Sequence, residues 1–185
     1  IIDKSVDKNI LSVDKNRMNT QMITPAERQI CQKRVTKEYG DMRTNPIPNV
    51  SVACDESDML SWFCMITALT KEEYIGGEYI VNIKLSPRYP FEAPDFYMLT
   101  PNGRFEINKK ICFSNSAHHQ ETWSPIWNMR TIILGFLSFF LEDSSSGIGH
   151  IETTKDTKIE LATHSRIYNL EKNTLIMQLF GSTTS

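Results

Sequence analysis

The side chains best suited to covalent chemistry in this chain are four cysteines: Cys31, Cys54, Cys64 and Cys112. None belongs to a C-x-x-C pair, which disfavours zinc ribbons and thioredoxin-like redox sites. The first three lie in segments with helical or strand-like apolar patterning, where a free cysteine usually behaves as a small buried hydrophobe. Cys112 lies in a polar, irregular stretch, and a reactive thiol has to be accessible. Cys112 is therefore the candidate nucleophile.

The histidines nearest to Cys112 bring two other chemistries into consideration. His118 and His119 follow it by six and seven residues, a loop spacing that fixes no geometry for a cysteine-protease base. The residue order and the lack of a papain-type signature argue against a protease. With Glu121 the two histidines could hold a metal ion, but the sequence offers no matching set of Cys or His partners. We therefore expect neither a bound metal nor a cofactor.

Residues 100–127, which contain Cys112, form an irregular stretch with several Pro, Gly, Asn and Ser residues. A loop of this length inside a compact domain is more often functional than idle. The helices and strands on either side of it must therefore position the candidate nucleophile.

The first of these elements is a helix that begins at Thr24. Thr24 can cap the helix, Pro25 suits its first position, and Glu27 completes a capping box. Its apolar face is predicted from residues at helical spacing, which are Cys31, Val35, Tyr39 and Met42.

Four strands are predicted next, in residues 50–54, 60–68, 78–85 and 95–99. The links between the first three carry turn residues such as Gly76 and Gly77, and short links favour an antiparallel meander. After the irregular stretch, three more helices are predicted, in residues 128–141, 155–168 and 171–180. Strands and helices that are segregated along the chain indicate an α+β fold.

The composition argues against several classes of protein. The 185 residues carry a formal net charge of −2, so no global basic field indicates a nucleic-acid partner. The most apolar stretch, residues 131–141, is shorter than the about 20 residues that a bilayer span needs, and we expect a core helix there. Residues 1–23 are predicted to be a flexible or weakly helical extension, and residues 181–185 look like the start of a linker.

Ordered motifs around Cys112 resemble the active-site region of ubiquitin-conjugating enzymes. Residues 89–114 read YPFEAPDFYMLTPNGRFEINKKICFS, with a Y-P-F-x-x-P segment, a tripeptide ending in Pro-Asn, and an I-C-hydrophobic-Ser segment. Residues 123–125 match the W-S-P that follows the cysteine in that family. The resemblance covers residues 24–180 and implies a UBC-like fold, with an N-terminal helix, a four-stranded antiparallel meander, a long active-site loop and C-terminal helices.

The same resemblance implies acyl transfer through Cys112. A ubiquitin-activating enzyme would pass ubiquitin to the Cys112 thiol as a thioester, and with a ubiquitin ligase the acyl group would move to a protein substrate. Asn102 is then a candidate donor to the oxyanion of the tetrahedral intermediate. The alternative is that Asn102 braces the loop by bonding to the backbone, and the two roles are compatible.

A ligase-docking surface is implied on two loops of the chain. Its residues by resemblance are Phe91, Ser124, Pro125 and Ile126. The alternative for Phe91, an aromatic residue between two prolines, is that its ring packs inward.

The activating enzyme is expected to meet the first helix on its basic side. The residues concerned are Lys33, Arg34 and Lys37, which fall opposite the apolar face on a helical wheel. The alternative is an ordinary solvated face, which is the commoner meaning of such a cluster.

A subfamily is also indicated. Thr100 stands where His is common, and residues 119–127 follow the pattern H-x-[DE]-T-W-x-P-x-W. These traits resemble the subfamily J enzymes, which are tail-anchored in the endoplasmic reticulum and serve protein quality control, although Gln120 departs from the usual Pro. We expect an enzyme on the cytosolic face of that membrane, with an apolar anchor beyond Ser185. Its expected role is in endoplasmic-reticulum-associated protein degradation.

Two other functions remain as alternatives. A non-catalytic variant of the fold would only bind ubiquitin or a ligase, but such variants lack the cysteine that this chain keeps. A conjugating enzyme for another ubiquitin-like modifier would keep it, and the TPNGRF run at residues 100–105 favours ubiquitin. Lysine and hydroxyl acceptors both stay open.

Overall fold

The computed structural model describes residues 22–111, 123–142 and 148–182. The candidate nucleophile Cys112 lies outside the described residues, as do His118, His119, Gln120 and Glu121. Most of the predicted extension, residues 1–23, and of the predicted linker, residues 181–185, lies outside as well, since residues 1–21 and 183–185 are not described. The proposed domain boundaries therefore stay predictions.

Helix α1, Pro25–Thr44, begins with the predicted capping box. The Glu27 amide donates to Thr24 Oγ1 over 3.2 Å, and the Thr24 amide donates to Glu27 Oε2 over 2.8 Å. Three of the four residues of the predicted apolar face are buried and Tyr39 is half-buried. Glu38 is buried beside them, which the helical spacing did not predict.

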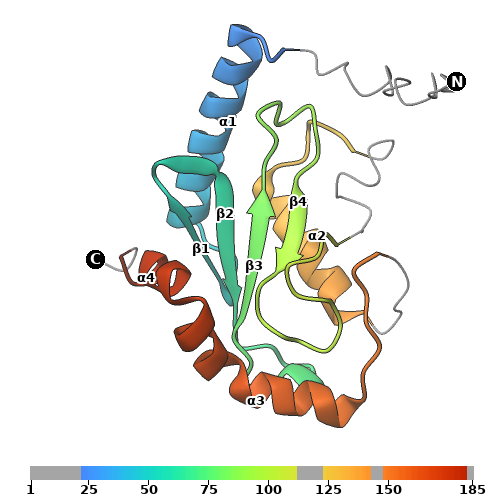
Figure 1. The fold of residues 1–185 in the computed structure, drawn as a ribbon. Helices are drawn as coiled ribbons and strands as arrows, with labels where there is room; N and C mark the ends of the chain where they lie inside the picture. Colours follow the sequence, from blue (N-terminus) through green and yellow to red (C-terminus); the bar gives the residue numbers. More distant parts are fainter. Residues whose placement is uncertain (1–21, 112–122, 143–147, 183–185) are drawn as a thin grey trace, which may run out of the picture.

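The sheet is the predicted antiparallel meander, with the spatial order β1-β2-β3-β4 (Figure 1). Its strands are β1 Val50–Asp55, β2 Asp58–Ile66, β3 Tyr79–Lys84 and β4 Asp95–Met98. Cys64 lies between Val52 and Val81, and Val81 pairs in turn with Met98. These directly paired residues share one face of the sheet, and all are buried. A short 3-10 helix, η2, Glu72–Tyr74, lies between β2 and β3 and was not predicted.

The remaining helices are α2 Met129–Leu141, α3 Lys155–Lys172 and α4 Thr174–Ser182. Helix α2 begins at a capping box in which Asn128 Oδ1 accepts from the Thr131 amide over 3.0 Å. The apolar stretch at residues 131–141 is therefore part of a helix with a buried side, as predicted. No helix within the described ranges has both the length and the apolar character required to cross a membrane.

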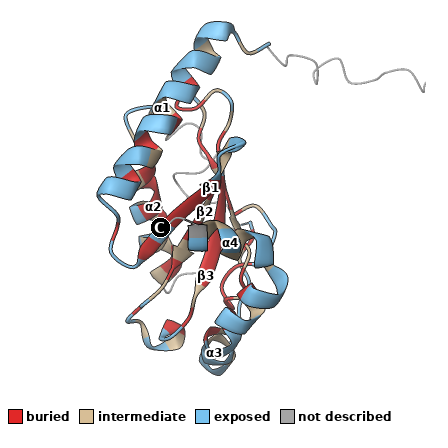
Figure 2. Cartoon of the chain, turned by 90° about the vertical axis from the view of Figure 1, so that its left-hand side faces the viewer, coloured by how far each residue is buried: buried red, intermediate tan, exposed pale blue. Residues whose placement is uncertain are grey.

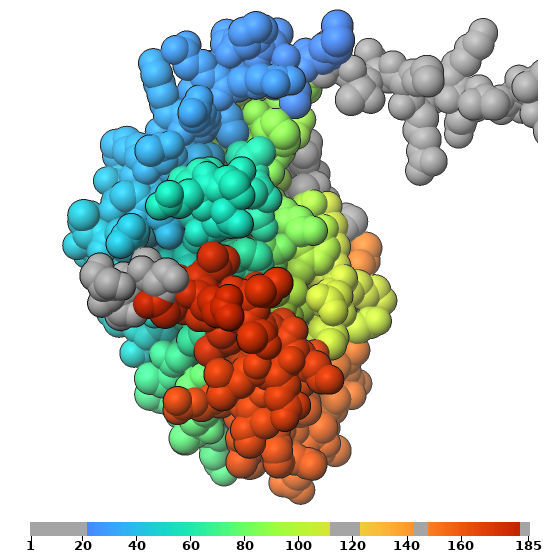
Figure 3. Space-filling model, turned by 60° about the vertical axis from the view of Figure 1, so that its left-hand side comes forward, coloured from blue at the N-terminus to red at the C-terminus, as the bar shows by residue number. Residues whose placement is uncertain are grey.

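The core lies between α2 and the face of the sheet that carries Cys64. The rings of Phe96 on β4 and Phe136 on α2 stack with centroids 4.9 Å apart. Figure 2 shows the buried residues concentrated in the strands and on the inward sides of the helices. On the other face of the sheet, α4 contacts β1, and Figure 3 shows α4 crossing over the strands. The four-stranded sheet with its helices is the expected α+β fold.

Candidate active site

The segment that leads toward Cys112 is anchored first at Thr100. This side chain is fully buried. Its hydroxyl oxygen accepts a hydrogen bond from the Ile80 amide over 2.9 Å, and the hydroxyl donates to Asn169 Oδ1 over 2.6 Å. Because Ile80 belongs to β3 and Asn169 to α3, the start of the segment is tied to the sheet and to a helix.

Asn102 uses both ends of its amide to hold the same segment, and its side chain is buried. Its Nδ2 donates to the carbonyl oxygens of Thr100 over 3.0 Å and Phe105 over 3.3 Å. Its Oδ1 accepts from the amides of Arg104 over 2.9 Å and Phe105 over 2.8 Å. An amide group offers two donor hydrogens, and both are engaged here. This geometry supports bracing, and donation to an oxyanion stays a prediction.

Gly103 lies where this turn comes closest to the start of α3. Its φ of +74° falls in the left-handed region, and a Cβ there would lie 2.6 Å from Thr153 Oγ1 and 2.8 Å from Lys158 Cγ. The Thr153 hydroxyl donates to the Gly103 carbonyl over 2.6 Å. Glycine is therefore required here both for its backbone conformation and for lack of space.

Arg104 attaches the segment to the end of α2. Its guanidinium donates through Nη2 to the Phe139 carbonyl over 2.7 Å and through Nη1 to the Glu142 carbonyl. Lys71 Nζ donates to the Leu141 carbonyl over 2.8 Å. The last carbonyls of a helix lack partners within the helix and carry partial negative charge, so cations at this end are stabilising. Arg104 therefore holds the segment and caps α2 at once.

His150 packs against the Phe105 end of the segment. Phe105 and His150 form an isolated antiparallel bridge, and the His150 ring packs edge-on against Phe105 with centroids 4.9 Å apart. A second ring, Phe139, lies 5.4 Å away. In the described part of the chain neither imidazole nitrogen has a hydrogen-bond partner. Burial, with a smaller contribution from the nearby Arg104 charge, lowers the pKa of His150.

The three described cysteines are buried, as their patterning predicted. Burial raises the pKa of Cys64 to about 12 and is also the main cause of the raised pKa values of Cys31 and Cys54. These thiols stay protonated at neutral pH, and a protonated thiol is a poor nucleophile. The assignment of Cys112 as the nucleophile stays a prediction, since this residue lies outside the described ranges.

The predicted ligase-docking residues are surface residues. Phe91 is 51% exposed and Ile126 is 80% exposed, so the alternative of an inward-packed Phe91 does not hold. Pro125 is exposed and Ser124 is half-buried. Ile30 on α1 is 44% exposed, and sequence reasoning missed it because its side chain lies outside both the apolar and the basic patterns of the helix.

A buried carboxylate, Glu38, joins the segments that carry these residues. Its Oε2 accepts from the Tyr89 hydroxyl over 2.7 Å and from the Met129 amide over 2.9 Å, while Oε1 pairs with Arg34 Nε. Burial, followed by the Glu38 charge, raises the pKa of Tyr89, so the phenol keeps the proton that it donates. The network fixes the loop after β3 to α1 and to the start of α2.

Two further hydrogen bonds complete this scaffold. Arg34 Nη2 donates to the Trp127 carbonyl over 3.0 Å, and Trp123 Nε1 donates to the Pro90 carbonyl over 2.8 Å. The loop of Phe91 and the loop of residues 123–127 are therefore bound to one another and to α1. The structure brings together the predicted docking residues of two distant sequence segments.

The prediction that Lys33, Arg34 and Lys37 all point outward from α1 is wrong for Arg34. Lys33 and Lys37 are exposed, and Lys37 pairs with Asp41 over 2.7 Å. The Arg34 side chain is only 29% exposed, because its guanidinium turns to Glu38 and the Trp127 carbonyl. Their role toward an activating enzyme stays a prediction.

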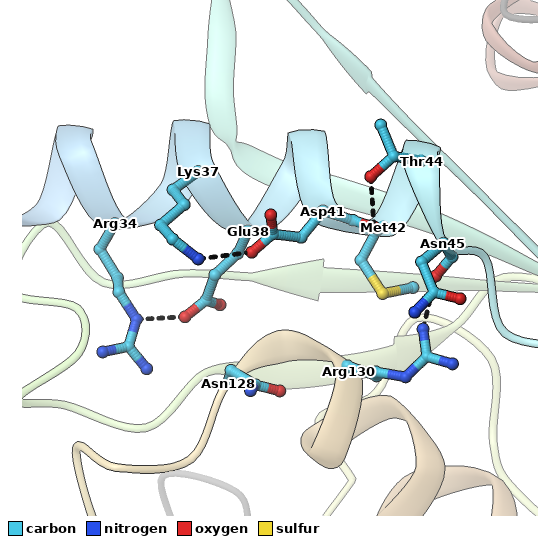
Figure 4. Close-up of a pocket in the computed structure, with 9 residues that line it drawn as sticks. All are labelled: Arg34, Lys37, Glu38, Asp41, Met42, Thr44, Asn45, Asn128 and Arg130. Atoms are coloured by element: carbon cyan, nitrogen blue, oxygen red, sulfur yellow. Dashed lines mark hydrogen bonds and ion pairs between the residues drawn. The ribbon is translucent and has the colours of Figure 1, made fainter.

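Between α1 and the start of α2 lies a groove of about 460 Å³. Figure 4 shows Arg34 and Lys37 directed along it toward their carboxylate partners, with Asn128 and Arg130 on the opposite wall. Across the described ranges, His, Cys, Asp and Glu side chains form no group able to hold a metal ion.

Comparison with known proteins places these features in one family. The family model described as ubiquitin-conjugating enzyme matches residues 34–164. Ubiquitin-conjugating enzyme E2 6 of Eremothecium gossypii is 40% identical over 148 residues, 80% of this chain and 61% of the relative. The E2 J2-like enzyme of Dictyostelium discoideum is 37% identical over 162 residues, 88% of this chain and 94% of the relative. Ubiquitin-conjugating enzyme E2 J2 of Bos taurus is 34% identical over 148 residues, 80% and 56% respectively. The chain thus spans about three fifths of the first relative.

Proposed function

The chain belongs to the ubiquitin-conjugating enzyme family, and on that basis we propose that it carries ubiquitin as a thioester on Cys112. A ubiquitin-activating enzyme supplies the ubiquitin, and a ubiquitin ligase assists its transfer to protein substrates. The observation that carries this proposal is the anchoring of the segment before Cys112 at Thr100, Asn102 and Arg104. Such anchoring fixes the backbone that leads to the proposed nucleophile. A reaction between bound groups is fast only when those groups are held in position.

Loading in this proposal is an exchange between two thiols. The Cys112 sulfur attacks the thioester carbonyl of ubiquitin on the activating enzyme, a new carbon–sulfur bond forms, and the old one breaks. The departing thiolate takes up the equivalent of the proton that Cys112 gives up. A free cysteine has a pKa of about 8.5, so part of an accessible thiol is thiolate at neutral pH. The buried Cys31, Cys54 and Cys64 cannot take this role.

Transfer forms an amide or ester bond and releases Cys112. The acceptor's nitrogen or oxygen attacks the thioester carbonyl, a tetrahedral oxyanion forms, and the carbon–sulfur bond breaks. The Cys112 thiolate then takes up the equivalent of the proton lost by the acceptor. Asn102 is proposed to hold the backbone at this point, and could serve as an oxyanion donor only by giving up one of its two present acceptors.

The ligase is proposed to dock on the exposed apolar residues of the joined loops. These are Phe91, Pro125 and Ile126, with Ser124 at their edge. Ile30 is added because it lies one helical turn before Arg34, whose guanidinium donates to the Trp127 carbonyl. Exposed apolar side chains that lie together are typical of protein interfaces. Lys33 and Lys37, together with the half-buried Arg34, are proposed to meet the activating enzyme.

We also propose that the enzyme acts at the cytosolic face of the endoplasmic reticulum in protein quality control. The TPNGRF run at residues 100–105 supports this, together with the J2 names of two relatives. An anchor beyond Ser185 is part of the same proposal.

The test is a loading reaction. The purified chain is incubated with activating enzyme, ATP and ubiquitin, or with another ubiquitin-like modifier in parallel, and run on a non-reducing gel. We expect a ubiquitin adduct that disappears on addition of thiol. A chain that forms no adduct with any modifier would be a binding variant of the fold, and one that accepts only another modifier would correct the proposed substrate.

A further inference from the structure

We propose that Asn169, on α3, is a positioning residue for the transfer reaction and acts through the hydroxyl of Thr100. The proposal rests on the proposed function, because it concerns the segment that leads into Cys112. Asn169 is fully buried. Its amide links α3 to Thr100, just after β4, and to the Glu78 carbonyl, just before β3.

The orientation of the Asn169 amide is fixed from both ends. Its Oδ1 accepts from the Thr100 hydroxyl over 2.6 Å and from Asn173 Nδ2 over 3.0 Å. Its Nδ2 donates to the Glu78 carbonyl over 2.8 Å. If the amide were rotated by half a turn, its Nδ2 would face another donor, Asn173 Nδ2, and its Oδ1 would face another acceptor, the Glu78 carbonyl. Only the observed orientation therefore satisfies every partner.

The direction of the Thr100 hydroxyl follows from that of the amide. Its oxygen already accepts from the Ile80 amide over 2.9 Å, so its hydrogen is free to point at Asn169 Oδ1. A hydroxyl supplies one donor and can accept as well, and both capacities are used. The chain of bonds therefore runs from the β3 backbone through Thr100 to α3, within a region that excludes water.

Thr100 is also the first residue of the segment that Asn102 braces. The Thr100 carbonyl accepts from Asn102 Nδ2 over 3.0 Å, so the backbone of Thr100 is fixed on one side by Asn102 and its side chain on the other by Asn169. Without the hydroxyl bond, the turn of residues 100–105 would keep its internal hydrogen bonds and its hydrogen bond to Thr153, but its first residue would lose its direct link to α3. Small displacements of a reacting group lower rates strongly even when binding is intact.

A matched residue one turn earlier on α3 separates positioning from stability. Ser165 is buried like Asn169, and its hydroxyl accepts from the Glu78 amide over 2.8 Å and donates to the Ala162 carbonyl. It therefore links α3 to the same neighbourhood but has no hydrogen bond to residues 99–105. Loss of Ser165 should lower stability as loss of Asn169 does, without moving the segment.

The experiment measures single-turnover discharge of preloaded ubiquitin thioester to free lysine. Only molecules that have folded and loaded contribute to this rate constant, so a change confined to stability leaves it unaltered. We expect Thr100→Val and Asn169→Leu to slow discharge roughly tenfold, with the double variant no slower than either single one. Thr100→Ser, which keeps the hydroxyl, and Ser165→Ala should both discharge at the wild-type rate.

Two results overturn the inference while leaving the proposed function in place. One is that the wild type loads and discharges, and that Thr100→Val and Asn169→Leu discharge as fast as the wild type and differ from it only by a lower melting temperature. The other is equal slowing by Ser165→Ala. If the two variants are too unstable to load, Asn173→Ala is the milder change. Asn173 is half-buried, and its Nδ2 donates to Asn169 Oδ1 over 3.0 Å and to the Leu99 carbonyl, next to Thr100, over 3.5 Å, so its loss loosens both sides of the Thr100–Asn169 contact. Discharge by Asn173→Ala at the full rate contradicts the inference equally, whereas failure of the wild type to load at all contradicts the proposed function instead.

Discussion

At the scale of single residues, Asn102 illustrates how a side chain can look catalytic and yet be occupied. Its four hydrogen bonds all go to backbone groups of residues 100–105. A buried amide with every partner satisfied is costly to disturb, because each backbone group left behind loses the hydrogen bond that Asn102 makes to it.

Asn102→Ala should therefore reduce stability as well as activity. It leaves the buried amides of Arg104 and Phe105 without their acceptor, at a cost of roughly 1–3 kcal/mol for each buried group. For a domain of this size, 1 kcal/mol corresponds to a shift of about 2–4 °C in melting temperature, which thermal unfolding would register. An unchanged melting temperature combined with slow discharge would identify Asn102 as an oxyanion donor and not a brace.

His150 gives the molecule a predicted pH response. Its folded pKa lies below the unfolded value of about 6.5, so the unfolded state binds the proton more readily. Stability then falls as the pH drops below about 6.5 and levels off once the folded state is protonated too. The carboxyl groups with lowered pKa values, those of Glu27, Asp55 and Glu73, act at lower pH because their ordinary values are 4.5 or less.

The comparison variant for this effect is His150→Phe, which keeps an aromatic ring between Phe105 and Phe139. Denaturant unfolding at pH 7.5 and 5.5 should show a smaller loss of stability in the variant than in wild type. Equal losses in the two proteins would mean that His150 does not titrate in that interval.

At the scale of elements, the buried Glu38 joins three of them. It holds the loop after β3 through Tyr89, the start of α2 through Met129, and the 123–127 loop through Arg34. A buried charge is tolerated only when it is paired and hydrogen-bonded. The network therefore explains both why a glutamate is inside and why the docking loops keep their arrangement.

Tyr89→Phe tests this network with little change of volume. It removes the hydroxyl that donates to Glu38, and a hydrogen bond to a charged group contributes about 1.5–3 kcal/mol. We expect weaker ligase binding, by roughly three- to tenfold, measured by titration with a ligase domain. The control is Tyr97→Phe, since the Tyr97 ring lies on β4 beside Lys84 and outside this network. Equal affinities of the two variants would count against the loop-holding role.

How far the sequence predicts these elements depends on the range of the interactions that stabilise them. The capping box joins Thr24 and Glu27, which are three positions apart, and was predicted correctly. The burial of Glu38 was not, because its partners Tyr89 and Met129 are 51 and 91 residues away. Thr100 and Asn169, 69 residues apart, were likewise not linked by sequence reasoning. Helix η2 has three residues, too few to produce a helical period.

At the scale of the whole molecule, the near-neutral chain leaves electrostatic recognition to local patches. The exposed Lys33 and Lys37 form such a patch on α1, while the half-buried Arg34 is turned toward Glu38. The ion pair between Lys37 and Asp41 is exposed on both sides and contributes little to stability. These lysines are therefore free to act on encounter rates.

Reversing Lys33 and Lys37 to Glu should slow thioester loading at low salt, and the effect should shrink as ionic strength rises. The control reverses Lys155 and Lys172 on α3, which changes the net charge by the same amount elsewhere on the surface. Initial loading rates at two salt concentrations give the comparison. If both pairs of reversals act alike, net charge alone is responsible and the α1 patch has no specific role.

The central claim is that Cys112 carries ubiquitin, and replacing this one side chain tests it most directly. Wild-type protein, Cys112→Ser and Cys112→Ala are loaded under the same conditions and treated with or without thiol before electrophoresis. We predict a thiol-sensitive adduct on wild type, a thiol-resistant oxyester on Cys112→Ser, and no adduct on Cys112→Ala. A thiol-sensitive adduct that forms normally on Cys112→Ala would contradict the account.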